Sequence, residues 1–151
     1  MAAYTTIDDP ALFFKANLYT GTASELAVTN VGFQSDSTLL KERDDGNAWT
    51  WYDSVRGATK YLKTSGTNAE ATDAQYLKSW QSTGYTVGTS VAVNSSSGLY
   101  VGYNWKAGTT TGIAGSPSIT PSSYSFDQTS GQSVIAYTGT GSVATVPHGL
   151  G

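Results

Sequence analysis

Side chains able to do chemistry are few and scattered in this chain. The 151-residue sequence has one histidine, His148, and no cysteine, so one chain cannot assemble a histidine-based triad, a thiolate metal site or a multi-histidine metal site. Its eleven acidic residues fall mainly in predicted turns. No two of them share a strand face beside aromatic residues, as the paired carboxylates of a glycosidase would. We therefore expect no enzymatic activity, no cofactor and no metal. A glycan-cleaving enzyme is the least favoured of the three hypotheses for function, after the structural module and the adhesin described below.

The best-defined polar pair is Asp53 and Arg56, three residues apart in a turn-like stretch that ends at Gly57. An arginine presents a rigid fork of donors that bridges carboxylates and carbonyl groups. Nothing else of a catalytic kind adjoins this pair in the sequence. We interpret it as a structural ion pair that fixes a loop at the rim of the fold, and a polar binding site is the alternative.

Aromatic residues offer a second kind of chemistry, because an exposed ring beside polar groups can stack on a sugar. The chain has four tryptophans, ten tyrosines and four phenylalanines. We expect most of them in the core, including Trp49 and Trp51, which share one face of a predicted strand. Tyr52 and Tyr100 lie on the opposite faces of their strands. They are our candidates for aromatic residues that face a glycan.

The elements that position these residues are predicted to be short strands. Alternating or apolar runs between turn signals indicate strands at 15–20, 28–33, 37–43, 49–53, 77–80, 85–88, 99–106, 118–126 and 132–138. One stretch, 68–76, has a composition that tolerates a helical turn. The clearest strand is 99–106, and we predict that one of its faces points inward: Leu99, Val101, Tyr103 and Trp105.

Composition supports an all-β class. Glycine, threonine and tyrosine are abundant, charged residues make up only 13%, and the net charge is −3. There is no cluster of lysine or arginine, so we expect no nucleic-acid partner. No apolar run is long enough to span a membrane, so we expect no membrane insertion. Many short strands with regular turns predict a two-sheet antiparallel sandwich or jelly roll.

The sequence also repeats itself. Tyr-Thr-Gly-Thr-Ala-Ser at 19–24 returns as Tyr-Thr-Gly-Thr-Gly-Ser at 137–142. Repetition of this kind marks serial architectures. We predict an N-terminal arm at 1–14, a sandwich domain at 15–138, and the start of a second repeat or a linker at 139–151. We expect that last segment to be an extended tether; the competing interpretation makes 143–146 a strand of the sandwich or one donated to a neighbouring subunit.

An ordered set of motifs resembles a repeated module of bacteriophage virion proteins of the marine phage, tail-fibre-like type. The motifs are Val-Gly-Phe-Gln at 31–34, Asp-Ser-Val-Arg-Gly at 53–57, Thr-Asn-Ala-Glu-Ala-Thr at 67–72, Gly-Tyr-Thr-Val-Gly at 84–88, Tyr-Val-Gly-Tyr-Asn-Trp-Lys-Ala-Gly at 100–108, and Pro-His-Gly-Leu-Gly at 147–151. The resemblance covers nearly the whole chain, including the opening at 1–10. It implies a concanavalin-like jelly roll, and one strand, at 38–43, departs from it by having leucine where a more aromatic strand is expected.

The resemblance also implies a place for the protein. We expect a non-enzymatic structural module on a phage tail or capsid exterior, part of a fibre, spike or decoration protein. Its expected partners are other virion proteins and copies of itself, most simply as a homotrimer. Phe13 and Phe14, which follow a polar arm, are our candidates for assembly contacts. An adhesin that binds host surface glycan is the alternative.

Overall fold

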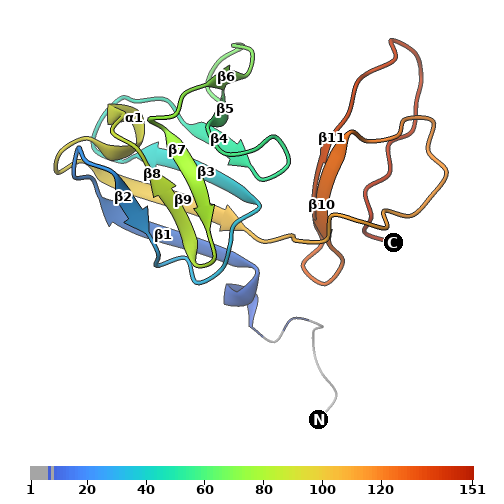
Figure 1. Cartoon of the computed structure of the whole chain (residues 1–151), viewed down its shortest axis with the longest axis horizontal. Coiled ribbons are helices and arrows are strands. Elements are labelled where there is room, and N and C mark those ends of the chain that lie inside the picture. The colour runs from blue at the N-terminus through green and yellow to red at the C-terminus, as the bar shows by residue number, and fades with distance from the viewer. Residues whose placement is uncertain (1–6, 8) are drawn as a thin grey trace.

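The computed structural model of the protein describes residue 7 and residues 9–151, and it is nearly all β structure (Figure 1). Two antiparallel sheets form a sandwich, and a two-stranded hairpin stands beside them. The predicted all-β sandwich is confirmed. Within the predicted arm at 1–14, residues 1–6 and 8 lie outside the described residues. The end of that stretch forms a 3-10 helix, η1 (Pro10–Leu12), whose first turn is capped by Asp9.

The larger sheet has six strands, each antiparallel to its neighbours. Their order across the sheet is β1 (Phe14–Thr20), β9 (Leu99–Trp105), β3 (Ser37–Glu42), β4 (Thr50–Asp53), β5 (Lys60–Lys63) and β6 (Ala71–Thr72). The smaller sheet has the order β2 (Leu26–Val28), β8 (Gly84–Val87) and β7 (Leu77–Gln81). The hairpin consists of β10 (Ser123–Asp127) and β11 (Gln132–Ala136).

Most strands lie close to where the sequence predicts them, but one predicted element is wrong. The helical turn expected at 68–76 does not form, because Ala71 and Thr72 make β6 and pair with β5. The α-helical turn of the described chain is α1 (Val91–Asn94), between β8 and β9. Local propensity is a weak guide to segments this short, since their tertiary partners decide the outcome.

The hydrophobic core lies between the two sheets. Leu40 and Tyr52 enter it from the larger sheet, and Leu77 and Tyr85 enter it from the smaller sheet. Each of these four side chains is fully buried. The remaining fully or nearly buried members of the cluster are Val28, Val31, Phe33, Val87 and Val93.

The face of β9 that points into this core is the opposite of the predicted one. The predicted inward residues all lie on the outer face: Leu99, Val101, Tyr103 and Trp105. Of these four, Val101 is buried there. Tyr100 and Asn104 are fully buried instead. Gly102 lies between them, and a Cβ on it would come within 2.6 Å of the Tyr85 hydroxyl group of β8. This face therefore contacts the smaller sheet directly, and glycine provides the space for that contact.

A polar residue is tolerated inside because its hydrogen bonds are made. The Asn104 amide donates to Asn17 Oδ1 at 2.8 Å and to the Lys15 carbonyl oxygen at 2.9 Å. Its oxygen accepts a hydrogen bond from the Thr38 hydroxyl group at 3.0 Å. Burial without these partners would cost several times what one hydrogen bond gains. The alternation along β9 thus separates its two faces correctly but does not show which of them is buried.

Asp36, just before β3, ties the sandwich to the hairpin. It is buried, and its Oδ1 accepts hydrogen bonds from the Ser54 hydroxyl group at 2.7 Å and from the Ser125 hydroxyl group of β10 at 2.9 Å. Its Oδ2 accepts a hydrogen bond from the backbone N–H of Ala107 at 2.9 Å. One carboxylate therefore holds together three segments that are far apart in the sequence.

The C-terminal residues return to the hairpin and do not leave the domain as a free tether. The backbone N–H of Thr145 donates to the Ser118 hydroxyl group at 2.8 Å, and the N–H of Ile119 donates to the Thr145 carbonyl oxygen at 3.1 Å. Pro147 and Gly149 are buried. The segment forms no strand of the sandwich either.

Candidate binding surface

The outer face of the six-stranded sheet carries a connected group of aromatic side chains. Strand register places Trp105 opposite Phe14 on one side and opposite Ser37 on the other, and it places Trp51 opposite Leu39. These side chains therefore point away from the smaller sheet. We call this surface the outer face; its aromatic members are Phe14, Trp49, Trp51, Tyr103 and Trp105.

The aromatic rings of the outer face contact one another. Phe14 lies 5.3 Å from Trp105 between ring centroids, and Trp51 stacks on Trp105 at 6.2 Å. Trp49 stacks on Tyr103 at 6.1 Å. Such pairs add about 0.5–1.5 kcal/mol beyond the area that they bury. The rings of the outer face therefore support one another.

Much of the outer face remains open to solvent. Phe14 and Trp51 are each 40% exposed, and Leu18 is 57% exposed. Leu62 and Leu99 add further exposed aliphatic surface at its margins. Monomeric proteins rarely expose a contiguous apolar patch of this kind unless it binds something. The expectation that Trp51 is buried is therefore wrong.

A cleft of about 350 Å³ lies at one edge of the outer face, beside the hairpin. Trp51 and Leu62 form its apolar side, and β11 lines the opposite side with residues 132–135. Polar groups enter it as well, and the Ser133 hydroxyl oxygen is buried with no hydrogen-bond partner among the described residues. We call this the Trp51 cleft. Its mixture of one exposed indole ring and a few polar groups is typical of small-ligand sites.

The predicted ion pair between Asp53 and Arg56 is present at the border of this cleft. Asp53 Oδ2 accepts a hydrogen bond from Arg56 Nε at 2.6 Å, and Oδ1 accepts one from the backbone N–H of Arg56 at 2.8 Å. The guanidinium group also reaches Glu70 at 3.2 Å and the Trp51 carbonyl oxygen at 3.2 Å. These contacts hold the turn after β4 in one conformation, as a structural ion pair does.

Both tyrosines expected to face a glycan are buried. Tyr52 is part of the core, and Tyr100 donates its hydroxyl hydrogen bond to the Val91 carbonyl oxygen at 2.6 Å. Burial raises the pKa of both phenol groups above the ordinary value for tyrosine. The prediction of exposure is wrong because it rested on the same reversed assignment of faces. Sequence reasoning missed Trp51 for that reason, although the alternation had already separated it from Tyr52.

The two predicted assembly contacts, Phe13 and Phe14, lie in different surroundings. Phe14 lies at the edge of the outer face, where it packs against Trp105, and its ring is partly exposed. Phe13 is half-buried at the end of η1, and its carbonyl oxygen accepts a hydrogen bond from the backbone N–H of Lys106. The structure thus brings Phe14, but not Phe13, into the aromatic group.

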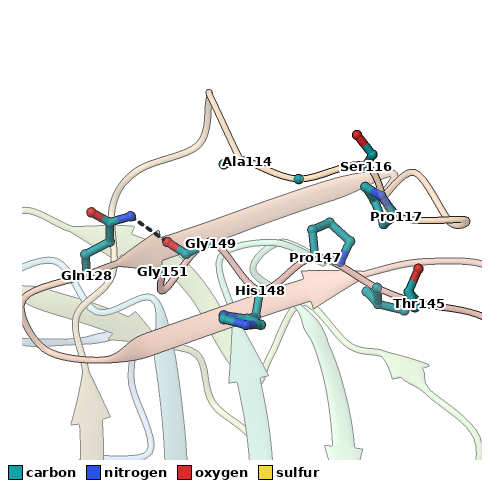
Figure 2. Close-up of a pocket in the computed structure, with 11 residues that line it drawn as sticks. Ala114, Ser116, Pro117, Gln128, Thr145, Pro147, His148, Gly149 and Gly151 are labelled. Atoms are coloured by element: carbon teal, nitrogen blue, oxygen red, sulfur yellow. Dashed lines mark hydrogen bonds between the residues drawn. The ribbon is translucent and has the colours of Figure 1, made fainter.

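A cavity of about 510 Å³ lies between the loop 114–117, Gln128 at the end of the hairpin, and the C-terminal residues (Figure 2). Gln128 donates a hydrogen bond to the Gly149 carbonyl oxygen across it at 3.0 Å. His148 is the single titratable side chain in its lining, and this exposed imidazole accepts a hydrogen bond from the backbone N–H of Leu150. Among the described residues, no aspartate or glutamate side chain lines this cavity.

Acidic and histidine side chains do not form a metal-binding group in the described part of the chain. Within residues 7 and 9–151, no three of them gather as a metal site would require. Over the same residues, no helix is both long and apolar enough to cross a membrane. The outer face and the Trp51 cleft are therefore the strongest candidates for function.

Comparison with known proteins assigns the chain to a family but not to an activity. Residues 9–151 match the family described as Domain of unknown function (DUF7483), so the protein belongs to that family. No curated protein matches the chain. No solved structure matches it either. The family match includes residues 139–151, which agrees with the packing of those residues against the hairpin.

We predict that Asp53→Asn lowers the free energy of unfolding by about 1.5–3 kcal/mol, because hydrogen bonds to a charged, buried carboxylate contribute that much. Glu70→Gln, the matched control, changes a more exposed partner of the same arginine and is expected to cost less than about 1 kcal/mol. Urea denaturation followed by circular dichroism measures both. Equal losses in the two variants would show that the buried pair has no special role.

Proposed function

We propose that this protein is a non-enzymatic structural module of a phage particle, part of a tail fibre, spike or decoration protein, and that it assembles through its outer face. The observation that carries the proposal is the connected aromatic group on that face, whose rings contact one another and remain partly open to solvent. The assignment to a phage particle is supported by the sequence motifs at 31–34, 53–57, 84–88 and 100–108.

A second copy of the chain is the occupant that best fits the outer face. Its exposed members include aliphatic side chains, Leu18 and Leu62, beside the rings of Phe14 and Trp51. The indole N–H of Trp51 already donates to the Ser37 hydroxyl group at 2.7 Å. An apolar partner surface can therefore cover this ring without leaving the N–H group unpaired. Interfaces between identical subunits are apolar and rich in aromatic residues at their centre. Symmetric association buries the same patch on each subunit.

Catalysis has no comparable support. The buried carboxylates of Asp36, Glu42 and Asp53 each accept hydrogen bonds from structural groups. The clefts lined by Asp36 and by Asp53 contain no second carboxylate among the described residues. Glycoside hydrolysis requires two carboxylates on opposite sides of the bond that is cleaved. These acids stabilise loops instead.

We predict that the wild-type chain forms a homo-oligomer, most simply a trimer, at micromolar concentration in sedimentation velocity. Phe14→Ser combined with Trp51→Ser should give species smaller than those of the wild type, because it removes two anchors of the apolar surface. Val143→Ser, which changes a fully exposed residue away from the outer face, is the control and should leave the oligomer intact. A wild-type chain that sediments as a monomer contradicts the proposal.

Glycan binding is the second candidate, and the Trp51 cleft is the observation that favours it. A ring partly open to solvent lies beside Gln132, Ser133 and the Asp53–Arg56 pair. An indole face can cover the apolar face of a pyranose, while amide and hydroxyl groups bind its hydroxyl groups. The cleft volume of about 350 Å³ is at the lower end of the range for ligand sites, which suits one or two sugar rings.

For this second candidate we expect binding on an array of bacterial surface glycans to fall by about tenfold in Trp51→Ala, equivalent to about 1.4 kcal/mol. Val143→Ser serves again as the control and should bind as the wild type does. A signal that survives Trp51→Ala places the glycan elsewhere. An array without signal, together with an oligomer that depends on Phe14 and Trp51, leaves assembly as the function of this face.

A further inference from the structure

The repeated sequence is also a repeated structure. We call Tyr19–Ser24 the first turn segment and Tyr137–Ser142 the second turn segment; their sequences differ at one position. In both, the hydroxyl group of the second threonine donates to the carbonyl oxygen of the serine two residues later. The same hydroxyl group accepts a hydrogen bond from that serine's backbone N–H. Two identical local hydrogen-bond patterns on nearly identical sequences indicate one turn formed twice.

The backbone conformations of the two turn segments are also alike. The residue between the threonine and the serine has a left-handed conformation in both turns, with φ of 56° at Ala23 and 73° at Gly141. Left-handed backbone is uncommon for residues other than glycine. Its presence at the alanine as well as at the glycine shows that this turn is imposed on the first segment by its surroundings.

Those surroundings are residues 90–98, which include α1 and which we call the clamp. Asn94 contributes most to it: its Oδ1 accepts a hydrogen bond from the backbone N–H of Thr22 at 2.7 Å, and its amide donates to the Ser24 carbonyl oxygen at 2.5 Å. The Tyr19 hydroxyl group donates to the Val93 carbonyl oxygen at 2.8 Å, and its ring stacks on Tyr100 at 5.0 Å. The first turn segment is thus held by both its backbone and its leading side chain.

The second turn segment has no comparable holder. Tyr137 is 52% exposed, and residues 138–142 are exposed as well. No hydrogen bond reaches the second turn segment from any other part of the described chain. It follows β11 directly, whereas the first turn segment begins within the last two residues of β1.

Gly139 indicates that the second turn segment could fit into a clamp. In the first turn segment, a Cβ on Gly21 would lie 2.1 Å from the Ser95 carbonyl oxygen of the clamp, so only glycine fits there. Gly139 occupies the corresponding position, where a Cβ would meet no atom within 4 Å, and its backbone is not left-handed. Nothing in its own surroundings requires glycine at this position. The clamp would require it.

We propose that the second turn segment docks into the clamp of a second copy of this chain, in place of that copy's own first turn segment. Among the described strands, β1 is at the edge of the larger sheet and pairs with β9 alone. The docked segment takes the place of Tyr19 and Thr20 at the end of β1, and Asn17 stays bonded to Asn104. Exchange of equivalent elements between identical chains replaces like contacts with like, so it is a low-cost way to associate. This association joins chains end to end and does not depend on the outer face.

The test uses the full chain with Gly21→Ala, which places a methyl group against the Ser95 carbonyl oxygen and weakens the resident segment. We expect species in sedimentation velocity that are larger than those of the wild type, because the second turn segment of a neighbour fills the vacated clamp. Adding Gly139→Ala to this variant should remove the larger species, because the incoming segment then carries the same steric clash.

The matched control adds Gly46→Ala instead, at a glycine that also has free space around it, and should keep the larger species. Far-ultraviolet circular dichroism on each variant shows whether the strands are retained. A Gly21→Ala chain with the size distribution of the wild type overturns the proposal. Larger species that persist with Gly139→Ala also overturn it, because they then arise from unfolding or from another surface.

Discussion

The hydrogen bonds of Asn104 fix how the three strands at one side of the larger sheet line up. This buried amide bonds to β1 through Asn17 and Lys15 and to β3 through Thr38. Side chains alternate along a strand, so a shift of one residue would send every side chain to the other face. A shift would also leave a buried amide without partners, at a cost of several kcal/mol. Asn104 therefore selects one register for β1, β9 and β3.

That choice of register determines what the protein presents to solvent. With Asn104 inside, Trp105 and Tyr103 lie outside, and Phe14 and Trp51 join them from the neighbouring strands. The core combines aliphatic side chains with tyrosines, and hydrogen-bonded polar residues are buried beside it, whereas the outer face carries exposed aromatic and aliphatic side chains. A sandwich that keeps hydrogen-bonded polar groups inside and tryptophan outside is suited to contact with another surface, which is the basis of the function proposed above.

The sequence predicted the strands better than it predicted their orientation. Period-2 alternation at 99–106 and the turn signals around it place β9 almost to the residue. Both faces of β9 carry aromatic residues, however, and the sequence does not show that Gly102 receives the Tyr85 ring or that Asn104 finds three partners. The errors at Tyr52, Tyr100 and Trp51 follow from this one ambiguity. The Asp53–Arg56 pair was predictable because both of its partners lie within one turn.

For the hairpin and the C-terminal residues, the sequence predicted local structure but not the long-range contacts. Strands near 118–126 and 132–138 were predicted, yet their attachment to the sandwich depends on Asp36, whose partners Ser54, Ala107 and Ser125 are remote in sequence. The repeat at 19–24 and 137–142 was visible in the sequence. Its meaning depends on the clamp, since the same turn is held in one place and left exposed in the other.

Hydroxyl-radical footprinting of the full chain, diluted until it is monomeric, tests the central claim that Asn104 directs one face inward and the aromatic face outward. Two matched pairs of side chains give the comparison: Tyr103 with Tyr100, and Leu62 with Leu40. The account predicts that Tyr103 and Leu62 are oxidised much faster than their buried counterparts, because Tyr100 and Leu40 are inaccessible to solvent. Faster oxidation of Tyr100 than of Tyr103 would mean that the sheet has the opposite face inside, and it would contradict the account.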